Sequence, residues 1–121
     1  MAVCQELEIE NQIIPRIAYG FAGGIGNTGA VCGAINGAVM AIGLKIDKAD
    51  TMKEALNQLA VVQDFRRRIE GEIGTIICRE LTGADLTTED GVRQFMSSDT
   101  PRKVCFPAVG LAYRIAVDLL K

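Results

Sequence analysis

The chain has 121 residues, of which 49% are hydrophobic and 23% charged, and its net charge is −2. This length and balance predict a single globular domain over residues 1–121 and exclude a disordered chain. Acidic residues flank the one basic run, residues 66–68, so the sequence lacks the basic patch of a nucleic-acid-binding protein. The longest apolar run, residues 30–44, is too short to cross a membrane, and residues 1–8 lack a basic signal region. We therefore expect a cytoplasmic protein without membrane insertion.

Two short helices and a glycine-rich loop are predicted for the N-terminal part. Apolar residues recur at helical spacing over residues 3–9 and 13–18, and Pro15 is tolerated in the first turn of the second helix. Glycine then occupies five of the ten positions from 20 to 29. This density indicates a loop with backbone conformations closed to other residues, or one that approaches a partner closely.

Residues 30–44 predict a buried central helix that is rich in glycine and alanine. Small residues recur at every fourth position, at Gly29, Gly33, Gly37 and Ala41, so one face of this helix carries almost no side chains. Another helix could approach this face closely. The same face could join two copies of the chain in a homo-oligomer.

The clearest amphipathic helix follows a capping box formed by Thr51 and Glu54. A break is predicted near Gly74, after which the periodic pattern resumes until a C-cap at Gly83. The apolar positions of the long helix are Met52, Leu56, Leu59, Val62, Phe65, Ile69 and Ile73.

The C-terminal part predicts a short helix and a terminal helix with an irregular start. Thr87 or Thr88 can cap the short helix, and Thr100–Pro101 is a typical helix start. Pro107 then requires either a kink or a later start, so the backbone beside Cys105 should be irregular. No alternating strand pattern is present, and the sequence predicts an all-α fold, a compact helical array around the central helix.

The glycine-rich loop contains the pattern G-x-G-x-x-G at Gly24, Gly26 and Gly29, with Asp47 near the distance of a ribose-binding acid. A dinucleotide fold needs a buried strand before this pattern, and the preceding residues predict helix instead. Two interpretations are left: backbone N–H groups that bind a small anion or nucleotide, or a tight loop that only permits helix packing.

Four cysteines and no histidine are present, so thiols are the main candidates for chemistry. No Cys-x-x-Cys pair occurs, and any shared site must be assembled by the fold. Cys32, Cys78 and Cys105 each lie beside a predicted helix start or a cation, where thiolates are favoured. Asn36 lies one turn beyond Cys32 and could donate to a thiolate or bound group, or to a neighbouring backbone group. Spacing alone leaves buried structural cysteines and a redox or metal site evenly matched.

The loop and the residues that follow it, Cys32-Gly-Ala-Ile-Asn-Gly, resemble the prokaryotic C_GCAxxG_C_C family of redox-active proteins. Cys78 and Cys105 match the two later cysteines of that pattern, and the likeness covers most of the chain. The family's first cysteine lies on a fuller N-terminal helix, farther from the second cysteine than Cys4 is from Cys32. We therefore expect that Cys4 does not replace it, and that the chain lacks the family's N-terminal helix and first cysteine.

The resemblance implies a redox-active or electron-transfer protein in which Cys32, Cys78 and Cys105 converge. They would act as ligands of an iron–sulfur cluster, since a related domain in a multihaem cytochrome is thought to hold such a cluster. Alternatively, they would act as a thiol/disulfide relay with a redox partner. The main alternative is a non-catalytic helical interaction module with structural cysteines. A weaker alternative is anion or nucleotide binding at the loop.

Overall fold

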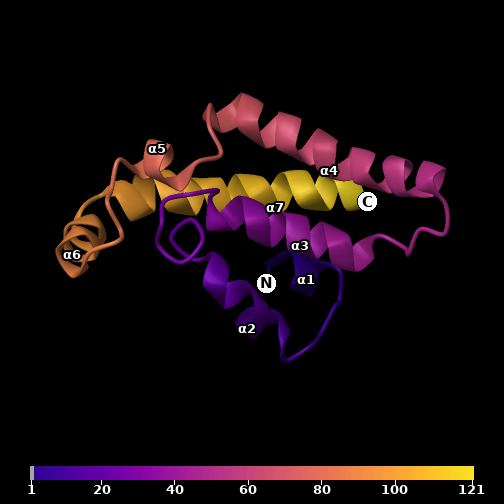
Figure 1. Ribbon diagram of the computed structural model, residues 1–121, viewed down its shortest axis with the longest axis horizontal. Helices are drawn as coiled ribbons and strands as arrows, with labels where there is room; N and C mark the ends of the chain where they lie inside the picture. Colours follow the sequence, from indigo (N-terminus) through magenta and orange to yellow (C-terminus); the bar gives the residue numbers. More distant parts are fainter. Residues whose placement is uncertain (1) are drawn as a thin grey trace.

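The computed structural model describes residues 2–121, so Met1 of the predicted domain lies outside the described residues, and within them every regular element is helical (Figure 1). The predicted all-α fold is confirmed. Three long helices form the body of the molecule, and four short helices lie around them. The helices are α1 (Ala2–Glu6), α2 (Ile14–Ala18), α3 (Gly33–Lys45), α4 (Met52–Ile73), α5 (Cys78–Thr82), α6 (Glu89–Ser97) and α7 (Phe106–Leu120).

Helix α7 lies between α3 and α4, and Figure 1 shows the three helices side by side. Small side chains make the contact between α3 and α7 close, because alanines on both helices are buried there. On α7 they recur at every fourth residue, at Ala108, Ala112 and Ala116, and on α3 the corresponding residue is Ala38. The sequence predicted that another helix would approach α3 closely along its glycine face. In the structure, the close contact between α3 and α7 is made largely by these alanines, which lie beside the glycine face.

Helix α4 is covered on one face and exposed on the other. Its capping box is present, because the Thr51 hydroxyl accepts a hydrogen bond from the Glu54 amide at 3.1 Å. Phe65 and Ile69 are completely buried against the rest of the core. Gly74 ends the helix with a φ of 87°, as the predicted break requires.

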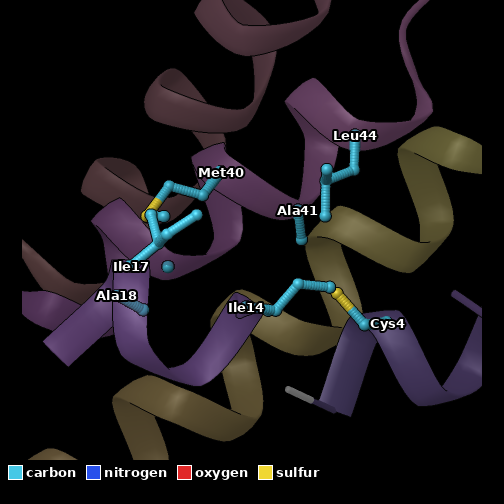
Figure 2. Close-up of a pocket in the computed structure, with 8 residues that line it drawn as sticks. Cys4, Ile14, Ile17, Ala18, Met40, Ala41 and Leu44 are labelled. Atoms are coloured by element: carbon cyan, nitrogen blue, oxygen red, sulfur yellow. The ribbon is translucent and has the colours of Figure 1, made fainter. Parts of the chain in front are cut away.

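The N-terminal helices pack beside the glycine face of α3. Helix α1 ends at Glu6, shorter than the predicted helix over residues 3–9, because the chain turns at Glu8 with a φ of 57°. A Cβ atom added to Gly37 would meet no atom within 4 Å, so the glycine face is not tightly packed there. A cavity of about 150 Å³ remains beside it, and Figure 2 shows the apolar side chains around this space. They are Cys4, Ile14, Ile17, Ala18, Met40, Ala41 and Leu44.

The remaining helix boundaries follow the predicted caps with one difference. Thr88 caps α6, and Gly83 ends α5 in the left-handed conformation, as predicted. The central helix begins at Gly33, three residues later than predicted, because residues 30–32 are extended. The terminal helix begins as a π-helical turn at Pro101–Cys105 and continues as α7, so the predicted irregularity beside Cys105 is confirmed. Among residues 2–121, no helix has both the length and the apolarity to cross a membrane.

Candidate cysteine site

The glycine-rich loop is a compact coil that uses its own carbonyl groups as hydrogen-bond acceptors. Gly26 donates to Gly20 at 2.8 Å, Gly29 donates to Gly23 at 3.1 Å, and Ala30 donates to the carbonyl of Gly24 at 2.9 Å. These backbone N–H groups are therefore not free to bind an anion. The loop follows α2 and a 3₁₀ turn, so the strand that a dinucleotide-binding motif requires is not present before it.

Gly24 brings the loop directly onto Cys78. Its φ is +72°, and a Cβ atom at this position would lie 2.7 Å from the Cβ atom of Cys78 and 2.7 Å from the Ala30 amide nitrogen. Gly29 lies equally close to Arg79, because its added Cβ atom would be 2.9 Å from that of the arginine. Gly26 has open space around it. Two of the three predicted loop glycines are thus needed for contact with the start of α5, and the third only for its backbone conformation.

An isolated antiparallel bridge between Val31 and Ile77 holds the segments that carry Cys32 and Cys78. Cys32 donates its amide to Ile76 at 2.8 Å, and Cys78 donates to Ala30 at 2.7 Å. Side chains alternate along extended segments, so both cysteines project from the same face of this pairing. They are diagonal neighbours, whose Cβ atoms stand roughly 7 Å apart in such pairs. Sequence reasoning missed this bridge, although the β-branched run after Gly74 was a signal for it.

Two of the three predicted cysteines lie at the start of a helix, and the third lies inside one. Cys32 is the N-cap of α3 and Cys78 is the first residue of α5, whereas Cys105 ends the π-helical turn that continues into α7. Helix α5 contacts this π-helical turn. Helix N-termini favour negative charge, which acts on the positions of Cys32 and Cys78 but not on that of Cys105.

Burial and mutual repulsion raise the pKa values of two of these thiols. For Cys78, burial raises the pKa most and a negative charge on Cys32 raises it further, while the Thr82 hydroxyl acts in the opposite direction. For Cys105, burial again raises the pKa most, followed by the charges of Cys32 and Cys78. Because each thiol is within electrostatic reach of the others, the fold brings these three cysteines into one cluster.

The thiols of this cluster are free and are not arranged as a closed coordination group. None of the four cysteines forms a disulfide. Within the part of the chain that the structure describes, no three cysteine or carboxylate side chains are placed to hold a metal ion together. Three thiols suit a soft metal or an iron–sulfur cluster by their chemistry, but the described side chains are not arranged as a ligand set.

Neither Cys4 nor Asn36 belongs to the cluster of three thiols. Cys4 is buried in α1 and lines the cavity beside Gly37 and Ala41, more than one turn along α3 from Cys32. The amide of Asn36 donates to the Val31 carbonyl at 3.5 Å, which is the second of the two roles that its position allowed. Asn36 thus supports the bend that leads from the bridge into α3.

Fold and site together define an all-α protein in which the packing of the helices brings three cysteines together from distant parts of the chain. The chain belongs to the C_GCAxxG_C_C family, whose model matches residues 1–119 and is described as "Putative redox-active protein (C_GCAxxG_C_C)". The family resemblance seen in the sequence is thereby confirmed. No curated protein and no solved structure matches the chain.

The raised pKa values predict a loss of stability at alkaline pH. A thiol with a raised pKa stays protonated in the folded chain while it ionises in the unfolded chain above about pH 8.5. Its stabilising contribution is therefore complete below that pH and is lost as the pH rises through the folded-state pKa. We expect urea unfolding of the metal-free, reduced protein to show this decline, and the Cys78→Ala/Cys105→Ala variant to show less of it. If the wild type and the variant lost the same amount of stability as the pH rose, the burial of Cys78 and Cys105 would be contradicted.

Proposed function

We propose that this protein is an electron-transfer protein whose redox centre is formed by Cys32, Cys78 and Cys105. Two observations support this proposal: a bridge pairs the segments of Cys32 and Cys78, and α5 contacts the π-helical turn that ends at Cys105. The family description agrees with redox activity. The proposed setting is the cytoplasm, where thiols stay reduced, and the proposed partner is a second redox protein.

The raised pKa values of Cys78 and Cys105 argue against either of them as the attacking thiol of a relay, so iron–sulfur ligation is the first version of this proposal. A relay needs one thiol with a low pKa that attacks a disulfide near neutral pH. A bound metal would replace the thiol protons and offset the repulsion between the sulfur atoms. Cys32, Cys78 and Cys105 would hold such a cluster, and the chemistry that it supplies when bound is one-electron transfer.

The thiol relay is the second version of this proposal, and the antiparallel bridge favours one pair for it. Cys32 and Cys78 project from the same face of the bridge, and joining them would require the two segments to move together until their Cβ atoms were about 4 Å apart. In this version two thiols give up two electrons and two protons and become a disulfide. A disulfide in the partner protein accepts both and becomes two thiols.

The experiment that tests the proposal is an anaerobic ultraviolet–visible spectrum of freshly purified protein, with iron, zinc and reactive thiols quantified per chain. We expect iron and visible charge-transfer bands in the wild-type protein, and loss of both in Cys32→Ser, Cys78→Ser and Cys105→Ser. Cys4→Ser is the matched control, because Cys4 is buried outside the cluster and should not be a ligand.

The other outcomes distinguish the remaining functions. A metal-free protein with one fast-reacting thiol would replace the cluster with the relay. Thiols that react only after unfolding, in a colourless and metal-free protein, would overturn the redox function. This result would favour the non-catalytic module with structural cysteines. Buried thiols such as those of Cys4 and Cys78 are expected in that module.

A further inference from the structure

We infer that the cavity between α1, α2 and α3 is a binding site for a small, uncharged aromatic molecule. This cavity, named here the α3 cavity, has a volume of about 150 Å³. Among the described residues that line it, the one cysteine is Cys4, which does not belong to the cluster of three thiols. The inference is therefore independent of the proposed redox function.

The lining of the α3 cavity offers very little to water or to a charged ligand. Its described side chains are apolar, apart from the weakly polar thiol of Cys4, and none of them carries a charge. The backbone groups of Gly37, Met40 and Ala41 are hydrogen-bonded inside α3. A buried water molecule needs about two to four polar partners. An apolar ligand is thus favoured over a polar one, because it displaces weakly held water.

The volume of the cavity and its opening set the size of the ligand. A cavity of similar volume and lining, engineered into another protein, binds benzene, so the α3 cavity is large enough for one benzene ring. Cys4 and Ala41 are 3% and 4% exposed and form its inner end. Ile17 and Leu44 are 58% and 52% exposed and flank its opening. A ligand can therefore enter between Ile17 and Leu44 while the helices stay folded.

Two sulfur atoms in the lining favour an aromatic ring over an aliphatic one. The thioether of Met40 and the thiol of Cys4 both line the cavity, and Figure 2 shows their sulfur atoms on different sides of it. Sulfur makes favourable contacts with aromatic rings at a distance of about 5 Å, often at the ring edge. Because Met40 is unbranched, its side chain can also adapt to the shape of the ring.

Gly37 leaves the cavity open although it weakens its own helix. Glycine destabilises the interior of a helix relative to alanine, and Gly37 lies inside α3. No close contact requires glycine here, because an added Cβ atom would meet no atom within 4 Å. Gly33 on the same face differs, since its added Cβ atom would lie 2.9 Å from the Phe21 carbonyl oxygen. An occupant of the cavity explains the space beside Gly37, whereas helix packing does not.

Calorimetric titration of the full, reduced chain with benzene tests the inference. We expect saturable binding of one benzene molecule per chain. The melting temperature should rise by about 5 °C at a benzene concentration about ten times the dissociation constant. Benzoate is expected not to bind, because the lining has no positive group to pair with its carboxylate.

Gly37→Leu fills the cavity, and Gly43→Leu is its matched control. Both changes replace a glycine of α3 whose added Cβ atom meets nothing within 4 Å, but Gly37 lines the cavity and Gly43 does not. We expect Gly37→Leu to weaken benzene binding by about tenfold or more, and Gly43→Leu to bind like the wild type. Ala18→Leu fills the cavity from α2 and should give the same loss, so the test does not depend on the folding of one variant. Circular dichroism checks the fold of each variant.

Met40→Leu tests the preference for an aromatic ring. Leucine keeps the approximate volume of methionine and removes the sulfur atom, so the change should weaken benzene binding about threefold and leave cyclohexane binding unchanged. Equal effects on both ligands would overturn the aromatic class. A wild type that does not bind benzene would overturn the inference, and so would a benzene affinity that Gly37→Leu and Ala18→Leu leave unchanged. None of these outcomes depends on whether the cysteine cluster holds a metal.

Discussion

Replacing Phe65 by alanine is expected to lower the free energy of unfolding by about 3–5 kcal/mol. Phe65 is completely buried and belongs to a cluster of buried residues that joins α1, α3, α4 and α7. Removal of its ring takes away the hydrophobic transfer energy and leaves a cavity that the surrounding helices cannot fill. Since small domains are stable by about 5–15 kcal/mol, this single change would bring the protein close to unfolding.

Urea denaturation followed by circular dichroism measures this loss. Tyr19→Ala is the matched control, because Tyr19 is also aromatic but is 82% exposed, and its removal should change the stability by less than about 0.5 kcal/mol. A similar loss of unfolding free energy in both variants would show that Phe65 of α4 is not buried against α3 and α7. The comparison thus tests the central packing of the fold.

The second large effect is expected for Gly24→Ala, which should lower the free energy of unfolding by about 2–4 kcal/mol. Alanine at this position would hold a left-handed conformation, and its Cβ atom would lie 2.7 Å from both Cys78 Cβ and the Ala30 amide nitrogen. The Ala30 contact is with backbone and cannot be relieved by a change of side-chain rotamer. The loop must therefore move away from α5, and Cys78 loses the surface that covers it.

Gly26→Ala separates the two causes of this effect. Gly26 has a φ of +60° and nothing within 4 Å of an added Cβ atom, so its replacement should cost only the left-handed strain of about 1–2 kcal/mol. Both variants are compared by urea denaturation and by the rate at which their thiols react. We expect faster thiol reaction in Gly24→Ala alone, because only this change uncovers Cys78. Equal behaviour of the two variants would contradict the contact between the loop and Cys78.

Local signals in the sequence determined most of the helices. Thr51 with Glu54, Thr88, Gly74 and Gly83 each act through the backbone groups of their own helix ends, so their roles can be predicted without knowledge of the fold. Pro107 predicted an irregular start of the last helix for the same reason, and a π-helical turn is found there. The all-α class follows from such local rules, because helical hydrogen bonds join residues that are close in sequence.

Elements that depend on distant residues were predicted less well. The extended residues before Cys32 are held by residues more than forty positions later, at Ile76 and Cys78. The β-branched run after Gly74 indicates an extended segment there, but no local pattern identifies the segment with which it pairs. The amphipathic pattern of α4 also predicted one continuous buried face, yet its first half is exposed because α3 and α7 cover mainly the second half. Periodicity shows which residues share a face but not how far a neighbour extends along it.

The candidate site likewise combines features that the sequence predicts with features that only the tertiary structure reveals. The sequence by itself made cysteines the main candidates for chemistry, since histidine is absent, and it selected Cys32, Cys78 and Cys105 through the family pattern. Only the tertiary structure decided that these three lie within electrostatic reach of one another while Cys4 lies beside the cavity under α1 and α2. The physical reason is that residue types are written in the chain, whereas burial, charge and distance arise only when segments far apart in sequence pack together.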